Sequence, residues 1–278
     1  MKFKIMALAA ACAAVFALGG CAAKNEDEEI FSNETIEQEE IFEEETFEEE
    51  APIEEDIPVT VPTPEPKIVK AGYIRITGDS VNIRSGAGTS YSALGTAEKS
   101  TLYSKLEKVG EWYKTQYKNK TAYISAKYCE EVEFDKSSDE IEKVIEEGTK
   151  CMGVKYVYGA VRLHDGKGNM YKGFTETEFD CSSLMQYIFY KGAGKLLNVN
   201  TRTQIYQGTT ISKPNLKRGD LIFFTNDSRK NNTGIERVGH VALYLGDNYI
   251  LHTASDYAKI EQMSAKRLSY FIQAQRVL

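Results

Sequence analysis

Alternating apolar and polar positions characterise the middle of the chain. Segments 81–84, 112–117 and 122–125 alternate with a period of two, and turns rich in Gly, Ser, Asn and Lys separate them. Short alternating strands divided by such turns are typical of a small all-β barrel. We therefore predict an all-β barrel over residues 71–134.

The pattern changes beyond the barrel. Residues 139–152 place apolar side chains at helical spacing, with Ser137 or Ser138 as a candidate cap, and a second helix is predicted over 181–191. Strand-like apolar runs follow at 221–224, 240–245, 249–252 and 271–277. Helices followed by a series of antiparallel strands predict an α+β domain over residues 137–278.

The N-terminus has the pattern of a secretion signal. Two lysines precede the apolar run 5–18, which is too short to span a bilayer. The run ends in small residues before Cys21, which resembles a bacterial lipobox, where the cysteine is lipidated. We expect residues 1–20 to be removed and Cys21 to anchor the protein to a membrane by lipid. The alternative is an ordinary signal peptide with a chance cysteine.

Acidic charge is concentrated near the N-terminus. Residues 1–58 hold 17 of the 41 acidic and 3 of the 34 basic side chains, so the other 220 residues carry a net charge of +7. Glutamates at this density repel one another, and residues 21–70 are predicted to form a disordered linker that ends in a proline-rich stretch. A basic folded part suits an anionic polymer such as a cell wall, while no motif favours nucleic acid.

The cysteine count leaves a free thiol. Cys12 leaves with the signal and Cys21 would carry lipid, so Cys129, Cys151 and Cys181 remain. Three is an odd number, and at least one cysteine is unpaired unless it bonds another chain. We expect Cys129 and Cys151 to be free, with a disulfide between them as the alternative.

Cys181 is the candidate nucleophile. It opens the second predicted helix, where peptide dipoles favour a thiolate, and Asp180 precedes it as a candidate N-cap. His240 could take the thiol proton, and His252 could orient His240 through its far nitrogen. We expect most of the depression of the thiol pKa to come from His240 as imidazolium. The alternative for each residue is a purely structural role.

The same residues also bear on the oxyanion donor, on metal binding and on the class of enzyme. The backbone amide of Cys181 is a candidate oxyanion donor, because first-turn amides lack helical partners. The trio lacks the close paired spacing of a zinc site, so we expect no metal. The order of cysteine, histidine and polar residue along the chain favours a papain-like cysteine peptidase.

The barrel segment resembles a bacterial SH3 domain. The resemblance is carried by Asn82-Ile83-Arg84-Ser85-Gly86, Gly110-Glu111-Trp112-Tyr113-Lys114-Thr115 and Thr121-Ala122-Tyr123-Ile124-Ser125. The third segment departs from the pattern because it lacks the glycine before the aromatic residue. The resemblance implies that the barrel binds peptidoglycan peptides or positions a linked catalytic domain.

The C-terminal part resembles the NlpC-type cell-wall peptidases, a papain-like family. Five segments carry the resemblance: Lys155–Gly159, Phe179–Ser183, Lys217–Phe224, Gly239–Gly246 and Ile250–Ala254. It implies a cysteine endopeptidase that cuts peptidoglycan stem peptides between γ-D-glutamyl and the diamino acid. Cys181, His240 and His252 stand at the catalytic positions of the family.

The resemblance also assigns substrate contacts. It places Tyr156 at the site as a candidate hydroxyl donor, with packing as the alternative. It implies that Asp180 and Ser182 help to bind the free amine of a stem peptide. Residues 162–178 are longer than the link that the family usually has before the nucleophile. We predict that this insertion, with His164, is a surface loop, and a substrate lid is the alternative.

The sequence therefore predicts a monomeric lipoprotein that faces the cell wall, hydrolyses peptidoglycan stem peptides and needs no cofactor. Two alternatives remain open. One is a Cys-His N-acetylmuramoyl-L-alanine amidase, and the other is a non-catalytic wall-binding lipoprotein with a decayed site. The presence of all three candidate catalytic residues argues against decay.

Overall fold

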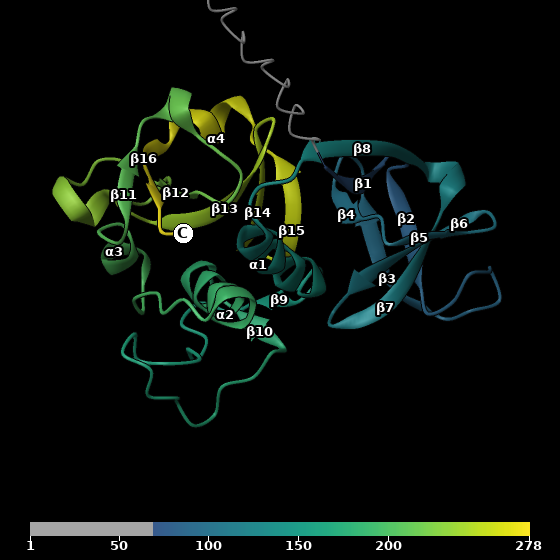
Figure 1. The fold of residues 1–278 in the computed structure, drawn as a ribbon, viewed down its shortest axis with the longest axis horizontal. Coiled ribbons are helices and arrows are strands. Elements are labelled where there is room, and N and C mark those ends of the chain that lie inside the picture. Colours follow the sequence, from purple (N-terminus) through teal and green to yellow (C-terminus); the bar gives the residue numbers. More distant parts are fainter. Residues whose placement is uncertain (1–68) are drawn as a thin grey trace, which may run out of the picture. The chain divides into compact units, whose positions relative to one another are not determined.

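The computed structural model of this protein describes residues 69–278 (Figure 1). The expected signal peptide, Cys21 and all but the end of the predicted linker lie outside these residues. Within residues 69–278, none of the helices has the length and apolar character that crossing a membrane requires.

The first part of the described chain consists of strands. They are β1 (Lys70–Ile76), β2 (Ser80–Arg84), β3 (Ala93–Glu98), β4 (Leu102–Ser104), β5 (Glu107–Val109), β6 (Trp112–Tyr117), β7 (Lys120–Ser125) and β8 (Cys129–Asp135), with the short 3-10 helix η1 (Ala126–Tyr128) before β8. One antiparallel sheet runs in the order β3-β2-β7-β6-β5, and β1 pairs with both β4 and β8. This arrangement agrees with the predicted barrel.

The predicted alternation is confirmed in β6, where every second side chain is buried. Lys118 and Asn119 join β6 to β7, and both have positive φ angles, of 51° and 57°. Positive φ at both central residues matches the right-handed twist of the flanking strands in a two-residue hairpin turn. The turn residues therefore set the register in which Trp112 pairs with Ser125.

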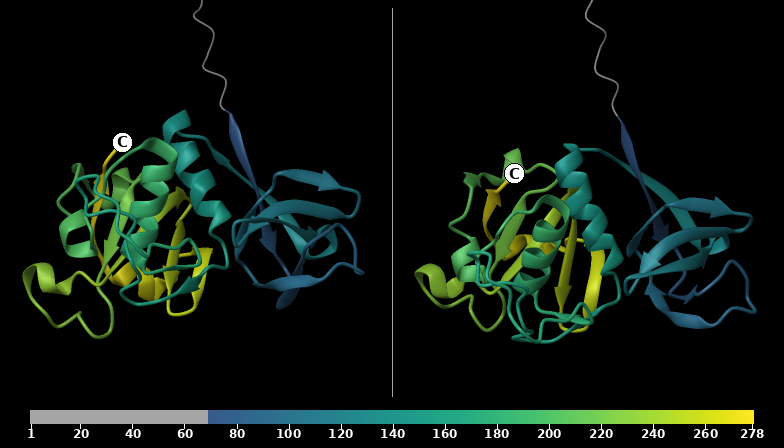
Figure 2. Two further views of the ribbon diagram at one scale, coloured as in Figure 1. Left: turned by 90° about the horizontal axis from the view of Figure 1, so that it is seen from below. Right: turned by 60° about the horizontal axis from the view of Figure 1, so that its bottom comes forward.

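The second part of the described chain mixes helices and strands. It comprises α1 (Asp139–Lys150), β9 (Lys155–Tyr156), β10 (Glu178–Phe179), α2 (Cys181–Ala193), α3 (Thr201–Gln204), β11 (Thr209–Ile211), η2 (Lys213–Asn215), β12 (Leu221–Phe224), η3 (Gly234–Arg237), β13 (His240–Gly246), β14 (Tyr249–Ala254), β15 (Tyr257–Gln262), α4 (Ala265–Ser269) and β16 (Phe271–Arg276). Its main sheet runs antiparallel in the order β11-β16-β12-β13-β14-β15, with α2 packed against β13 and β14 (Figure 2). The predicted α+β class is confirmed.

Ser138 caps α1 by accepting a hydrogen bond from the Ile141 amide, as predicted.

Helices α1 and α2 pack closely because Gly192 lies between them. In α2, a Cβ atom added at Gly192 would lie 2.5 Å from the Cα atom of Val144. No side chain larger than hydrogen fits there unless the α1 backbone moves. This close approach holds α2, and with it Cys181, against the body of the domain.

A buried ion pair fixes α1 to the sheet. Arg218 donates to Glu142 from Nε at 2.7 Å and from Nη2 at 3.0 Å. The same guanidinium donates to the carbonyl of Leu245 and to the Tyr73 hydroxyl of β1. A bidentate pair with further hydrogen bonds offsets the cost of burying both charges. Arg218 therefore connects the first helix, the central sheet and the barrel.

We expect Gly192→Ala to lower the free energy of unfolding by about 1–3 kcal/mol, because it overpacks the α1–α2 contact. Helix propensity alone would predict the opposite sign, a gain of about 1 kcal/mol. Denaturant unfolding of the purified protein measures the difference. The exposed neighbour Lys191→Ala is the control and should change stability little. A Gly192→Ala variant as stable as the parent would refute the close contact.

Candidate functional site

A capping box positions Cys181 at the start of α2. The Asp180 carboxylate accepts a hydrogen bond from the Ser183 amide at 2.8 Å, and the Ser183 hydroxyl accepts one from the Asp180 amide at 2.9 Å. The predicted N-cap role of Asp180 is confirmed. Cys181 is the first residue of the helix, so its own amide has no helical acceptor.

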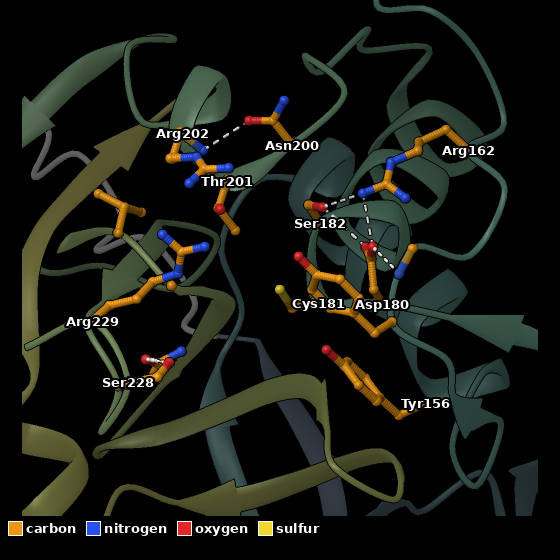
Figure 3. Close-up of a pocket in the computed structure, with 15 residues that line it drawn as sticks. Tyr156, Arg162, Asp180, Cys181, Ser182, Asn200, Thr201, Arg202, Ser228 and Arg229 are labelled. Atoms are coloured by element: carbon orange, nitrogen blue, oxygen red, sulfur yellow. Dashed lines mark hydrogen bonds and ion pairs between the residues drawn. The ribbon is translucent and has the colours of Figure 1, made fainter. Parts of the chain in front are cut away.

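Cys181 lines an open pocket of about 510 Å³. The other lining residues are Tyr156, Tyr158, Gly159, Arg162, Asp180, Ser182, Asn200, Thr201, Arg202, Asn226, Ser228, Arg229, Val238 and Gly239. Figure 3 shows the sulfur atom pointing into the space between the wall with Asp180 and Ser182 and the wall with Arg229. Cys181 is only 8% exposed, and its sulfur borders this pocket.

Three adjacent strands bring two histidines and a carboxylate into one chain of hydrogen bonds. His240 begins β13, His252 lies in β14 and Glu261 lies in β15. Nε2 of His240 lies 2.9 Å from Nδ1 of His252, and Nε2 of His252 lies 3.1 Å from Oε1 of Glu261. The expected contact between the two histidines is thus present, with Glu261 as a further partner that the sequence did not indicate.

Glu261 fixes the tautomers of both histidines. A carboxylate only accepts hydrogen bonds, so Nε2 of neutral His252 must carry the proton that it donates to Glu261. Nδ1 of His252 then holds a lone pair, and Nε2 of His240 donates to it. The remaining nitrogen of His240, Nδ1, is therefore an unprotonated base in the neutral ring.

The Cys181 sulfur lies near the start of β13, the strand that carries His240. The backbone amide of Val241, the residue after His240, interacts with the sulfur, as does the amide of Ser182. Across the described part of the chain, the sulfur makes no hydrogen bond to the His240 ring. Such bonds are often long without substrate and tighten when it binds. Cys181 therefore lies near the backbone of the strand that carries His240, whereas neither His240 nor His252 is among the residues that line its pocket.

Burial favours the neutral forms of both Cys181 and His240. It raises the pKa of the Cys181 thiol to about 12, and the Asp180 carboxylate adds to this effect. Burial also lowers the pKa of His240 well below its ordinary value, and His252 adds to that shift. The expected depression of the thiol pKa by an imidazolium is wrong for this geometry, because desolvation outweighs the backbone amides at the sulfur.

The outer members of the hydrogen-bond chain respond differently to burial. Burial lowers the pKa of His252, although the Glu261 carboxylate opposes this shift. Burial is the largest single influence and works to raise the pKa of Glu261, but the hydrogen bond from His252 and the nearby charges of Lys259 and Arg267 together lower it overall. Glu261 is therefore ionised at neutral pH, as its role as a pure acceptor requires.

Tyr156 reaches the pocket through a short parallel strand pair. In this pair, β9 lies beside β10, the strand that leads into Asp180, so Tyr156 aligns with Phe179. Burial raises the pKa of Tyr156 to about 12, and the nearby Cys181 contributes. The hydroxyl therefore keeps its proton at neutral pH and can donate a hydrogen bond into the pocket (Figure 3).

Asp180 and Ser182 line the pocket as expected, but neither side chain is free. Arg162 donates from Nη2 to Oδ2 of Asp180 at 2.7 Å and to the Ser182 hydroxyl at 3.3 Å. Ser182 in turn donates to Oδ1 of Asp180 at 3.0 Å. Sequence reasoning missed Arg162, because a mostly irregular segment separates it from Asp180, which lies 18 positions further along the chain.

The prediction for His164 is wrong. Its side chain is fully buried rather than part of a surface loop, and its ring lies 5.4 Å from that of Tyr190. Nδ1 of His164 accepts a hydrogen bond from the Gly166 amide, which shapes a turn. Most residues that follow His164 in the insertion are exposed, so the predicted surface loop describes those residues but not His164.

Cys129 and Cys151 are both free thiols, and burial raises the pKa of each. Over residues 69–278 there is no group of three or more His, Cys, Asp or Glu side chains that could hold a metal ion.

Comparison with known families identifies two parts of the chain. Residues 153–276 match the model of the NlpC/P60 family, and residues 79–130 match that of the bacterial SH3 domain. Peptidoglycan endopeptidase RipB of Mycobacterium tuberculosis is 31% identical over 120 residues, which are 43% of this chain and 46% of RipB. Gamma-D-glutamyl-L-lysine dipeptidyl-peptidase of Bacillus cereus is 35% identical over 83 residues, 30% of this chain and 23% of that protein.

One solved structure also resembles part of the chain. The crystal structure of an NlpC/P60 family protein from Bacillus cereus superimposes with a TM-score of 0.40 at 21% identity, over 75% of this chain and 64% of that one. This chain spans less than half the length of the curated relatives that it matches.

Alkylation of Cys181 tests the protonation state of the thiol. Because its pKa is raised to about 12, the rate with iodoacetamide should rise about tenfold per pH unit from pH 7 to pH 9 without a plateau. Peptide mapping by mass spectrometry separates Cys181 from Cys129 and Cys151. A plateau near neutral pH would show a preformed thiolate and contradict the neutral pair.

Proposed function

Because residues 153–276 are a papain-like NlpC/P60 domain and residues 79–130 a bacterial SH3 domain, we propose that this protein is a cysteine peptidase of peptidoglycan stems. One observation carries the proposal. The Cys181 sulfur opens into a pocket at a helix start and lies near the backbone amide that follows His240, whose free nitrogen is held unprotonated by the chain through His252 to Glu261.

The first chemical step is attack on an amide carbonyl. Nδ1 of His240 takes the proton from Cys181 as the sulfur forms a bond to the carbonyl carbon. The positive charge that develops on His240 is stabilised through His252 by the Glu261 carboxylate. Neutral reactants suit this route, because proton transfer and bond formation occur together and no buried ion pair has to exist beforehand.

Two donors are available for the oxyanion. The backbone amide of Cys181 lacks a helical partner, and the Tyr156 hydroxyl stays protonated. His240 next gives its proton to the leaving amine, and the carbon–nitrogen bond breaks to leave a thioester. Water then attacks the thioester with His240 as base, which restores the thiol and releases the acid.

The bond that we propose as the target joins γ-D-glutamyl to the diamino acid. The NlpC-type motifs and the similarity to the gamma-D-glutamyl-L-lysine dipeptidyl-peptidase of Bacillus cereus support this choice. The barrel, taken as residues 71–134, would bind wall peptides or position the catalytic part, taken as 137–278. With the signal 1–20 removed, lipid on Cys21 and the linker 21–70 would place a monomeric enzyme outside the membrane, facing the wall.

Digestion of purified peptidoglycan tests the proposal. We expect the wild-type protein to release fragments cut after γ-D-glutamate, and Cys181→Ala to release none, because the alanine has no nucleophile. Mass spectrometry of the soluble products identifies the bond. Cys151→Ala is a matched control that removes a buried thiol away from the pocket.

Each other outcome has a distinct meaning. Intact stem peptides would point to an N-acetylmuramoyl-L-alanine amidase. No products from either protein, with retained binding to peptidoglycan, would point to a non-catalytic wall-binding protein. Equal products from wild type and Cys181→Ala would exclude Cys181 as the nucleophile.

Glu261→Gln tests the tautomer chain. An amide can donate as well as accept, so it no longer fixes the proton on His252. We expect kcat to fall about 10²-fold, near the lower end of what a positioned general base contributes, with KM little changed. Gln262→Ala, an exposed position on the same strand, is the control. A Glu261→Gln variant with unchanged kcat would remove Glu261 from the mechanism.

A further inference from the structure

Arg162 is built into the pocket wall that Asp180 and Ser182 form. Besides its bonds to these two residues, its Nε donates to the Val199 carbonyl at 2.8 Å and its Nη1 to the Ala160 carbonyl at 2.6 Å. Figure 3 shows the guanidinium directed at the Asp180 carboxylate. Two backbone carbonyls and two side chains therefore hold one arginine in a single position.

The Asp180 carboxylate has no capacity left for a ligand. Oδ1 accepts from the Ser183 amide at 2.8 Å and from the Ser182 hydroxyl at 3.0 Å. Oδ2 accepts from Arg162 at 2.7 Å and from the Gly159 amide at 3.3 Å. A carboxylate offers about four acceptor positions, and all are used. An incoming ammonium group would have to displace the guanidinium.

The charge of the pocket also disfavours a cation. Its charged lining residues are Asp180 and three arginines, Arg162, Arg202 and Arg229. Arg202 and Arg229 share one carboxylate oxygen of Glu236, at 2.7 and 3.2 Å. One carboxylate, that of Glu236, thus pairs with two arginines on that wall, while Asp180 on the opposite wall is already paired with Arg162. The surplus is positive, which repels an ammonium group and suits the carboxylates of a stem peptide.

We propose that Arg162 is a specificity residue that closes this wall to free amines. The pocket then takes stems whose first amine is acylated, as it is in glycan-linked peptidoglycan, in preference to free peptides. The proposal rests on the proposed function and replaces the expectation that Asp180 and Ser182 bind a free stem amine. An acylated nitrogen carries no charge, so it does not compete with the guanidinium for Asp180.

Two synthetic substrates test the proposal. One is the free tripeptide L-alanyl-γ-D-glutamyl-diamino acid, and the other is the same tripeptide acetylated on the alanine nitrogen. The readout is the ratio of kcat/KM for the acetylated to the free peptide. We expect the wild-type ratio to be about 10 or more, since a charge-assisted hydrogen bond must be broken to admit the ammonium.

The variants separate specificity from structure. Arg162→Ala leaves Asp180 unpaired in the pocket, so the ratio should fall to about 1 or below. Arg162→Lys keeps a positive charge beside Asp180 and should retain a ratio above that of Arg162→Ala. Lys167→Ala, an exposed residue of the same insertion, should keep the wild-type ratio. Thermal unfolding of each variant confirms that the comparison is made on folded protein.

Other results would overturn the proposal in identifiable ways. A wild-type preference for the free tripeptide, or the same ratio in folded Arg162→Ala, would remove Arg162 as a specificity residue. Cleavage of neither peptide would count against the proposed function instead. In that case, calorimetric binding of both peptides to Cys181→Ala still decides the inference, which requires tighter binding of the acetylated peptide.

Discussion

The hydrogen bond between Glu261 and His252 is the constraint on which the site depends. A carboxylate cannot donate, so this one contact sets the proton position on His252 and, through it, on His240. These proton positions are kept only if strands β13, β14 and β15 keep their register, since each strand contributes one residue of the hydrogen-bond chain. The antiparallel sheet therefore acts as more than a scaffold, because its pairing decides which nitrogen of His240 is left without a proton.

Burial and charge act on the same few groups. Desolvation keeps Cys181 and His240 neutral, and Asp180 raises the thiol pKa further, while Arg162 works in the opposite direction. Asp180 must stay at the helix start because it caps α2. Pairing it with Arg162 compensates its charge without losing the cap. The same ion pair thus limits how far Asp180 raises the thiol pKa, and it occupies the carboxylate that a cationic ligand would otherwise contact.

Sequence patterns predicted what is local and missed what is contacted across the fold. The strands of the hairpin 112–125, the helix cap at Ser138 and the N-cap at Asp180 follow from periodicity and capping chemistry. Glu261 was missed because β15 was not predicted, although Ala258 and Ile260 alternate with charged neighbours there. Arg162 was missed because no pattern links an irregular segment to a partner 18 residues away.

The reacting residues and the charged residues of the pocket walls come from different kinds of element. The residues that would perform the chemistry come from regular elements, α2 and three strands, where hydrogen-bonded backbone fixes them within narrow limits. Two of the three pocket arginines come from irregular segments: Arg162 follows β9, and Arg229 precedes η3. Loops can change without disturbing the sheet register. A change of charge on these walls would therefore leave the chain from His240 to Glu261 intact, so under the proposed function the pocket walls, and not the reacting groups, would set substrate choice.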